Sequence, residues 1–305
     1  MLTVGATKIL PRAVSVIDLY GRTNQLLRWK CAMEMKTIKY EVSEKIATIT
    51  LARPARMNAW TGRMHTEYRW ALLQADNDPE VRAIILTGEG RGFCVGADSQ
   101  ALEGHVARGE YDPGTPEEIP EPGFGVRSEF NANFAYHFGL SKPIVVAING
   151  AIAGVGLVLA CYCDIRFAAP GVKMTTAHGK LNLPAEYGLS WLLPRQIGLP
   201  RANDLLLTSR VFLSEEAEQL GLINRVIEAE SLLSETRAYV KSMIDTVSPG
   251  SLKASRRQIY ADQHRSVDQA VAESETLLQA MMKQNDYQEG VAAFLEKRHP
   301  VWTDS

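Results

Sequence analysis

Apolar runs that alternate with helical patterns constrain the fold of this chain most strongly. The runs are "VRAIILTG" (81–88), "KPIVVAING" (142–150) and "CDIRFAAP" (163–170), and the helical pattern "GVGLVLACY" (154–162) lies between the last two. Continuous apolar runs of this length are typical of strands buried on both faces. Strands that alternate with helices predict an α/β fold in which helices cover parallel strands.

Two further patterns precede the first run. Residues 36–51 alternate apolar and polar side chains about a short turn near 43–45, which predicts a β-hairpin. Residues 61–78 have helical spacing, with Thr61 as a plausible N-cap and Asp-Pro at the end. The segment 103–127 is rich in Pro, Gly and Glu, so we expect a loop there, either a pocket wall or a surface insertion.

The chain changes character after residue 200. Helical patterns cover 201–212, 214–222, 231–247, 248–263 and 266–284. Ser214, Ser248 and Ser266 each suit an N-cap position. We therefore expect an α/β core over residues 36–200 and a helical region over 201–305, which either caps the core or forms a subunit interface.

Composition excludes several functional classes. The chain is 46% hydrophobic and 22% charged with a net charge of −2, which gives no overall attraction to nucleic acid or anionic membrane. The four cysteines have no metal-ligand spacing and predict buried thiols in a reduced compartment, and no metal is expected. Residues 1–35 are basic and poor in acids, which suits a transit peptide or an upstream start codon.

Two glycine-bearing junctions follow buried strands. They are "LTGEGRGFCVGAD" (86–98) and "AINGAIAGVGLVLACYCD" (147–164). In the second, Gly154-Val155-Gly156 opens a helix, whose first N–H groups are unpaired and lie at the positive end of its dipole. Two such loops facing each other would bind an anion or an oxyanion, although glycines here also serve simple turns.

Several motifs together resemble the crotonase, or enoyl-CoA hydratase/isomerase, superfamily over about residues 36–300. They are "ARPARMNAW" (52–60), "GRGFCVGAD" (90–98), "KPIVVAINGAIAGVGLVLACYCDIRFAA" (142–169), "YGLSWLLPRQIG" (187–198), "SEEAEQLGLINRVI" (214–227) and "FLEKR" (294–298). The resemblance implies an α/β fold built as a spiral of repeated ββα units, with a C-terminal α-helical region that forms trimers, two of which can stack into a hexamer.

The resemblance also implies an acyl-CoA substrate and no other cofactor. The thioester oxygen would lie between the backbone N–H groups of Val95 and Val155. The CoA moiety would meet residues from three motifs. They are Arg53 and Arg56 near the phosphates, the backbone around Cys94, Ala97 and Asp98 against the adenine, and Phe294 and Lys297, which would complete the nucleotide pocket. For the three cations, a solvated surface position is the alternative.

The acidic residues depart from the hydratases of the family, which use two glutamates to activate a water. The corresponding positions hold Val158 and His178, of which only His178 can handle a proton. Glu186 lies two residues before Gly188, where isomerases of the family place their catalytic acid. One carboxylate suffices to move a proton between two carbons. The alternative is that Glu186 only complements the dipole of the helix that follows.

We therefore expect an enoyl-CoA or dienoyl-CoA double-bond isomerase, with a hydratase using an unusual acid set as the alternative. Another class remains open: a silent CoA-binding homologue, or an RNA-binding one that uses the basic stretch "LKASRRQ" (252–258). We expect no nucleic-acid or membrane partner, and a cytoplasmic location unless residues 1–35 direct the chain to mitochondria. Trp60, Tyr187, Trp191 and residues 103–138 are candidates for the wall of the acyl pocket.

Overall fold

A computed structural model describes residues 34–109, 130 and 132–303 of the chain. The chain divides into two units, 1–35 and 36–305, and the description below concerns the second. The expected transit peptide and most of the segment 103–127 lie outside the described residues. The boundary expected at residue 200 does not separate two compact units, since one unit contains both the core and the helical region.

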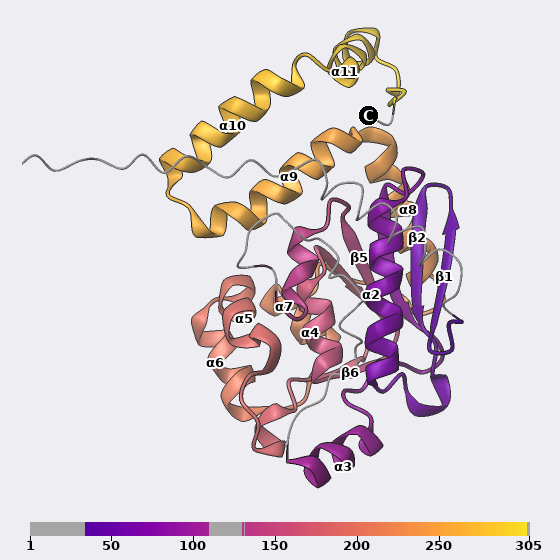
Figure 1. Cartoon of the computed structure of the whole chain (residues 1–305), viewed down its shortest axis with the longest axis vertical. Coiled ribbons are helices and arrows are strands. Elements are labelled where there is room, and N and C mark those ends of the chain that lie inside the picture. Colours follow the sequence, from indigo (N-terminus) through magenta and orange to yellow (C-terminus); the bar gives the residue numbers. More distant parts are fainter. Residues whose placement is uncertain (1–33, 110–129, 131, 304–305) are drawn as a thin grey trace, which may run out of the picture. The chain divides into compact units, whose positions relative to one another are not determined.

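A six-stranded sheet forms the centre of the second unit (Figure 1). Its order is β1-β2-β3-β5-β7-β10, with bounds Ile38–Ser43, Ile46–Leu51, Ala83–Gly88, Ile144–Ile148, Ile165–Ala168 and Arg225–Val226. The β1–β2 pair is antiparallel and every other pair is parallel. The predicted hairpin and the predicted buried parallel strands are thereby confirmed, and β5 is buried along its whole length.

A second, smaller sheet follows the order β4-β6-β8-β9. Its strands are Gly92–Cys94, Ala151–Ala153, Lys173–Thr175 and Phe212–Leu213. The strands β4 and β6 lie inside the two glycine-bearing junctions and pair in parallel with each other. The sequence pattern did not reveal them, because strands of three residues are too short to show a period.

Helix α2 (Gly62–Asn77) packs against β1 and β2. The Thr61 hydroxyl accepts the N–H of Met64 at 3.1 Å, so the predicted N-cap is confirmed. The buried carboxylate of Glu67 accepts the N–H and the hydroxyl of Thr37, each at 2.7 Å, and the Nε of Arg63 at 2.6 Å. These charge-assisted bonds compensate the burial of the charge and fasten the helix to the start of β1.

Two helices flank the junctions. Helix α4 (Val155–Tyr162) is buried at every residue, which fits its apolar composition. Helix α3 (Ser99–Arg108) extends into the segment that we expected to be an irregular loop, so that expectation is wrong for residues 103–108.

Helix α5 (Leu189–Ile197) is the helix expected after Glu186. The five helical patterns predicted after residue 200 correspond to α6 (Leu199–Thr208), α7 (Ser214–Leu220), α8 (Leu232–Thr246), α9 (Pro249–Ala261) and α10 (Val267–Met281). The last helix, α11 (Asn285–Glu296), was not predicted. Short 3₁₀ turns add Pro54–Arg56, Ala135–Gly139, His178–Leu181, Glu186–Gly188 and Asp262–His264.

The three predicted N-caps had different outcomes. The Ser248 hydroxyl caps α9 by accepting the N–H of Ser251, and Ser266 occupies the N-cap position of α10. The prediction for Ser214 is wrong, because Leu213 is the N-cap of α7 and Ser214 is its first residue. The Ser214 hydroxyl instead accepts the N–H of Val172 at 3.1 Å.

A buried ion pair fastens α9 to the core. Arg256 is 4% exposed and lies 2.9 Å from the Asp164 carboxylate, and its guanidinium also donates to the carbonyls of His137, Phe138 and Leu140. The basic stretch 252–258 is therefore not a continuous exposed stripe, because its central arginine faces inward. This removes the main observation behind the RNA-binding alternative.

Among the described residues, no helix is long and apolar enough to cross a membrane. The thiols of Cys94, Cys161 and Cys163 are free and buried, as expected of these three, while Cys31 lies outside the described residues.

Candidate functional site

A cavity of about 590 Å³ opens between the two glycine-bearing junctions, α3 and two 3₁₀ turns. Its lining is largely apolar and consists of Trp60, Thr61, Gly62, Val95, Gly96, Ala97, Ala101, Leu102, Val106, Gly109, Gly154, Val155, Ala177, His178, Leu181, Leu183, Glu186 and Tyr187. Four residues proposed for catalysis from the sequence, Val95, Val155, His178 and Glu186, thus line one cavity although they come from separate segments.

Glu186 is the only carboxylate among the described lining residues. It is half-buried, and its side chain has no hydrogen bond or ion pair within the described part of the chain. Burial raises the pKa of Glu186, because the charged form loses water and gains no counter-charge. A carboxylate with a raised pKa in an apolar cavity is suited to accept a proton and return it.

The local backbone separates Glu186 from the helix that follows. Tyr187 has φ 49° and Gly188 has φ 84°, so the chain reverses before α5 begins at Leu189. Gly188 is the N-cap of α5, and the first turn of α5 contains no acid. Complementing the dipole of α5 therefore does not explain why an acid stands at position 186.

A hydrogen bond from α4 holds this turn in place. The Tyr162 hydroxyl donates to the Tyr187 carbonyl at 2.8 Å. A Cβ atom on Gly188 would lie 2.9 Å from the same hydroxyl, so both the space and the positive φ require glycine there.

The two backbone N–H groups expected to bind an oxyanion differ in the hydrogen bonds that they already make. Val155 is the first residue of α4, and its N–H has no partner among the described residues. The N–H of Val95 donates to the Met57 carbonyl at 3.3 Å, which is longer than an ordinary N–H···O bond. One donor is free and the other is weakly held, so both can serve a ligand oxygen.

Close backbone contact between the junctions explains why they carry glycine. A Cβ atom on Gly156 would lie 2.2 Å from the Cys94 carbonyl oxygen, and one on Gly150 would lie 2.0 Å from the Arg91 carbonyl oxygen. Either side chain would force the two loops apart. The first turn of α4 can approach the Val95 loop only because these positions lack side chains.

The positions of the two hydratase acids have different surroundings. Val158 is 1% exposed within α4 and does not line the cavity. His178 is 6% exposed and lines the cavity, and its Nδ1 is buried without a hydrogen-bond partner among the described residues.

Aromatic side chains back one wall of the cavity. Trp60 and Tyr187 line it, and the buried ring of Phe134 lies behind them, 6.0 Å and 4.8 Å from their ring centroids. Trp191, also expected in the wall, does not line the cavity, because its ring stacks on His264 at 5.7 Å and lies under the Arg195 guanidinium.

The expected phosphate-binding arginines meet at Asp98. Its buried carboxylate lies 2.9 Å from Arg53 and 3.4 Å from Arg56. Arg53 also donates to the Ala59 carbonyl at 2.5 Å, whereas the Arg56 side chain is 49% exposed. Burial alone would raise the pKa of Asp98, but hydrogen bonds from the Gln100 N–H and from the arginines hold it below its ordinary value. Arg53 is therefore committed to the fold, and Arg56 is the more available cation.

Other expected CoA contacts are not gathered in one chain. Cys94 is fully buried and its carbonyl faces Gly156, and the expected contact of the backbone around it with adenine stays a prediction. Ala97 lines the cavity, as expected of a ligand-binding residue. Phe294 is 82% exposed on α11 and lines a separate groove with Trp302, and Lys297 ends that helix. Figure 1 shows α11 and α3 at opposite ends of the 36–305 unit.

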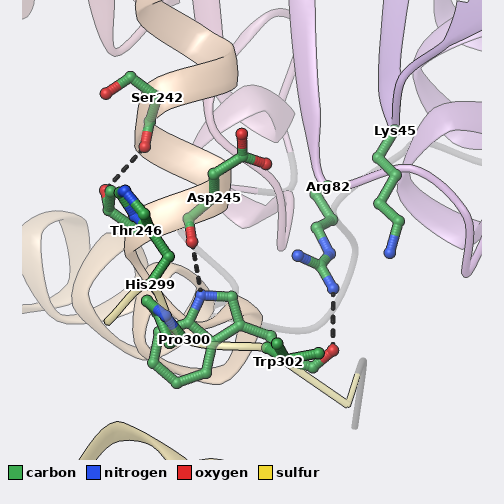
Figure 2. A pocket seen from close by; sticks show the side chains of 9 residues that line it. Lys45, Arg82, Ser242, Asp245, Thr246, His299, Pro300 and Trp302 are labelled. Atoms are coloured by element: carbon green, nitrogen blue, oxygen red, sulfur yellow. Dashed lines mark hydrogen bonds between the residues drawn. The ribbon is translucent and has the colours of Figure 1, made fainter. Parts of the chain in front are cut away.

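Another cavity forms where the end of the chain meets α8 (Figure 2). Trp302 donates from its indole to the Asp245 carbonyl at 3.1 Å, and the Arg82 guanidinium donates to the Trp302 carbonyl at 3.4 Å. These bonds fasten the C-terminal segment to the core. The cavity holds none of the residues proposed for catalysis or CoA binding.

Comparison with known proteins supports the motif resemblance. Residues 41–305 match the family model described as enoyl-CoA hydratase/isomerase. The chain is 33% identical over 269 residues to the 1,2-epoxyphenylacetyl-CoA isomerase of Escherichia coli, covering 88% of this chain and 99% of that protein. It is 35% identical over 267 residues to a Mycobacterium tuberculosis protein named "Probable enoyl-CoA hydratase EchA12", covering 85% and 90%.

Solved structures agree in fold. An enoyl-CoA hydratase/isomerase from Mycobacterium paratuberculosis superimposes with a TM-score of 0.73 at 29% identity, over 90% of this chain and all of that one. The α/β architecture with C-terminal helices is thus the crotonase fold. The chain therefore belongs to the enoyl-CoA hydratase/isomerase family and is an acyl-CoA enzyme.

Proposed function

We propose that the protein is an enoyl-CoA or dienoyl-CoA double-bond isomerase in which Glu186 carries the proton. The observation that supports this most directly is that Glu186 is the one carboxylate among the described cavity residues, with neither an ion pair nor a hydrogen bond to explain it. The relative from Escherichia coli is also named an isomerase of an acyl-CoA, although its named substrate is an epoxide and not an enoyl thioester.

The reaction needs one base and one oxyanion site. With a 3-enoyl thioester, the Glu186 carboxylate removes a proton from C2, and the electron pair of that C–H bond delocalises into a dienolate. The negative charge on the thioester oxygen is stabilised by the N–H groups of Val95 and Val155. Glu186 then gives the proton to C4, which leaves the double bond between C2 and C3. Fixed donors in an apolar cavity contribute roughly 3–4 kcal/mol to such a step.

The CoA moiety is proposed to lie toward Arg56, whose half-exposed guanidinium is available for phosphate. Phe294 and Lys297 would reach a nucleotide only in another copy of the chain, since α11 lies away from the cavity in one chain (Figure 1). Association of copies as trimers or hexamers is supported by α10, which has no buried residue and exposes Val267, Val271 and Leu278. Light scattering of the purified protein tests this proposal.

Hydration is the second candidate, because several relatives are named hydratases. It requires activation of a water, for which family hydratases use two carboxylates. Val158 cannot supply one, and Glu186 would need His178 as its partner. We therefore expect hydration of crotonyl-CoA to be at least 100-fold slower than isomerisation of a 3-enoyl-CoA.

The experiment is a substrate panel of 2-enoyl-, 3-enoyl- and dienoyl-CoA thioesters. It compares wild type with Glu186→Gln and with Glu230→Gln, a matched change at an exposed carboxylate. Glu186→Gln should lower isomerisation at least 100-fold, while Glu230→Gln should leave it unchanged. Full activity of Glu186→Gln would refute the assignment. Binding of CoA without turnover of any thioester would instead identify a silent homologue.

A further inference from the structure

The histidines of the described chain differ in how their ring nitrogens are paired. His137 is completely buried, and both of its nitrogens have partners: Nδ1 lies 2.5 Å from the Phe134 carbonyl and Nε2 lies 2.7 Å from the Tyr68 hydroxyl. A carbonyl can only accept, so Nδ1 carries the proton and Nε2 accepts from Tyr68. The protein itself fixes the tautomer of His137, so we assign this histidine a structural role.

His178 is the opposite case. Its side chain has no hydrogen bond or ion pair among the described residues, and its Nδ1 is buried without a partner. Only its backbone is engaged, where its N–H donates to the Thr176 carbonyl at 2.8 Å and its carbonyl accepts the N–H of Leu183 at 3.1 Å. The backbone is fixed while the tautomer is left open, so a bound molecule decides whether the imidazole donates or accepts.

The position of His178 makes such a molecule the acyl group. His178 lines the same cavity as Glu186, and the neighbouring wall positions Ala177, Leu181 and Leu183 offer only apolar side chains. The buried Nδ1 is closed to a ligand, so the ring can meet one only through Nε2, which is not among the buried unpaired atoms and has no hydrogen bond within the described residues. The thioester oxygen is not the atom that Nε2 would meet, because the proposed backbone donors already serve it.

We infer that His178 hydrogen-bonds an oxygen on the acyl chain, so that the preferred substrates are acyl-CoA thioesters bearing a hydroxyl or keto oxygen in addition to the thioester carbonyl. His178 is a specificity-determining residue in this arrangement, separate from the proton carrier Glu186. Sites built to hydrogen-bond a substrate oxygen discriminate strongly against analogues that lack it, because the site is then left unpaired. The inference rests on the proposed function only in placing the acyl group in this cavity.

Binding of unreactive ligands tests the inference without turnover. Calorimetry compares hexanoyl-CoA with 3-hydroxy- and 4-hydroxyhexanoyl-CoA, which share the CoA moiety, the thioester and the chain length. The binding preference is the ratio of the Kd of hexanoyl-CoA to the Kd of whichever hydroxylated ligand binds more tightly. This ratio should fall about tenfold in His178→Leu. His178→Asn, which keeps a hydrogen-bonding side chain, should retain part of it. His264→Leu is the matched control, because His264 lies outside the cavity and should leave the preference unchanged.

A spectroscopic measurement covers the case in which His178→Leu does not fold. Wild-type protein is labelled with ¹⁵N-histidine, and the imidazole signal of His178 is the one that is absent from the spectrum of His178→Asn. This signal should shift when the hydroxylated ligand binds and should not shift when hexanoyl-CoA binds. The inference is overturned if the preference is equal in wild type and His178→Leu, or if both ligands shift the signal alike. If the wild-type protein isomerises no thioester of the panel but keeps the binding preference, only the proposed function is refuted and the inference about His178 stands.

Discussion

Tyr162 and Tyr187 connect the two halves of the proposed catalytic site through one hydrogen bond, in which the Tyr162 hydroxyl donates to the Tyr187 carbonyl at 2.8 Å. Tyr162 is the last residue of α4, and Val155 is the first. The helix whose first N–H is the proposed oxyanion donor therefore holds, at its other end, the turn that carries Glu186.

Tyr162→Phe tests whether the hydrogen bond to the Tyr187 carbonyl positions Glu186 for proton transfer. The change removes one hydrogen bond and leaves the buried ring, so we expect a loss of about 1 kcal/mol in the free energy of unfolding. The Glu186 turn becomes less restrained, and kcat for a 3-enoyl-CoA should fall about tenfold with KM changed less than threefold. Denaturant titration and steady-state kinetics check both. An unchanged kcat would show that the bond does not position Glu186.

The titration of Glu186 predicts opposite pH effects on activity and on stability. Burial raises the pKa of this carboxyl, so activity should be lost as pH falls through a pKa above 4.5. A carboxyl with a raised pKa binds more protons in the folded state, so its contribution to stability declines as pH rises. Glu186→Gln should therefore melt above wild type at pH 8, with the difference shrinking by pH 4. Thermal unfolding at both pH values checks the sign.

Substitution of Asp98 should mainly lower stability, whereas substitution of Arg56 should mainly weaken CoA binding. The pKa of Asp98 is held low, so its pairing stabilises the protein at neutral pH and is lost as pH falls through that lowered pKa. Asp98→Asn should cost roughly 2 kcal/mol at pH 7 and progressively less as pH falls below 4. Arg56→Gln should leave the melting temperature nearly unchanged and weaken CoA binding several-fold, with a smaller salt dependence. Equal effects of the two variants on CoA affinity would contradict this division.

Gly156→Ala tests the contact between the two junctions. Its Cβ would lie 2.2 Å from the Cys94 carbonyl oxygen, and backbone cannot give way as a flexible side chain can. We expect a loss of more than about 2 kcal/mol in stability together with loss of turnover. Gly250→Ala in α9 is the control, since its Cβ would make only ordinary contacts, 3.5 Å from the Gln284 side chain and 3.9 Å from that of Met281. Chemical denaturation of both variants is the measurement.

His137 predicts acid sensitivity of the folded state. Burial lowers its pKa to about 4, whereas an unfolded histidine titrates near 6.5. The unfolded chain therefore binds more protons between these values, and stability should fall as pH decreases from 6.5 toward 4. The slope contributed by this group approaches 1.4 kcal/mol per pH unit. His137→Gln should reduce the slope, which unfolding titrations at half-unit pH steps would resolve.

Local patterns in the sequence determined the elements and the residue types of the site. The apolar runs and helical periods located every strand of the main sheet except β10, and most helices, since burial of one face or both leaves a direct trace in the residue order. Motif resemblance nominated Val95, Val155, His178 and Glu186. The strands β4 and β6 were missed because three residues carry no period, and Ser214 was misplaced because its hydroxyl serves Val172, far away in the chain.

Only the tertiary structure decided how these residues are used. The sequence could not distinguish Arg53, committed to Asp98 and Ala59, from Arg56, which stays half exposed, because the partners are distant in the chain. It could not show that Arg256 faces inward or that Trp191 lies away from the cavity. Nor could it tell that, within the described part of the chain, the Glu186 side chain has no partner and no hydrogen bond fixes the tautomer of His178. Burial and pairing are properties of the folded neighbourhood, and they give identical residue types different chemistry.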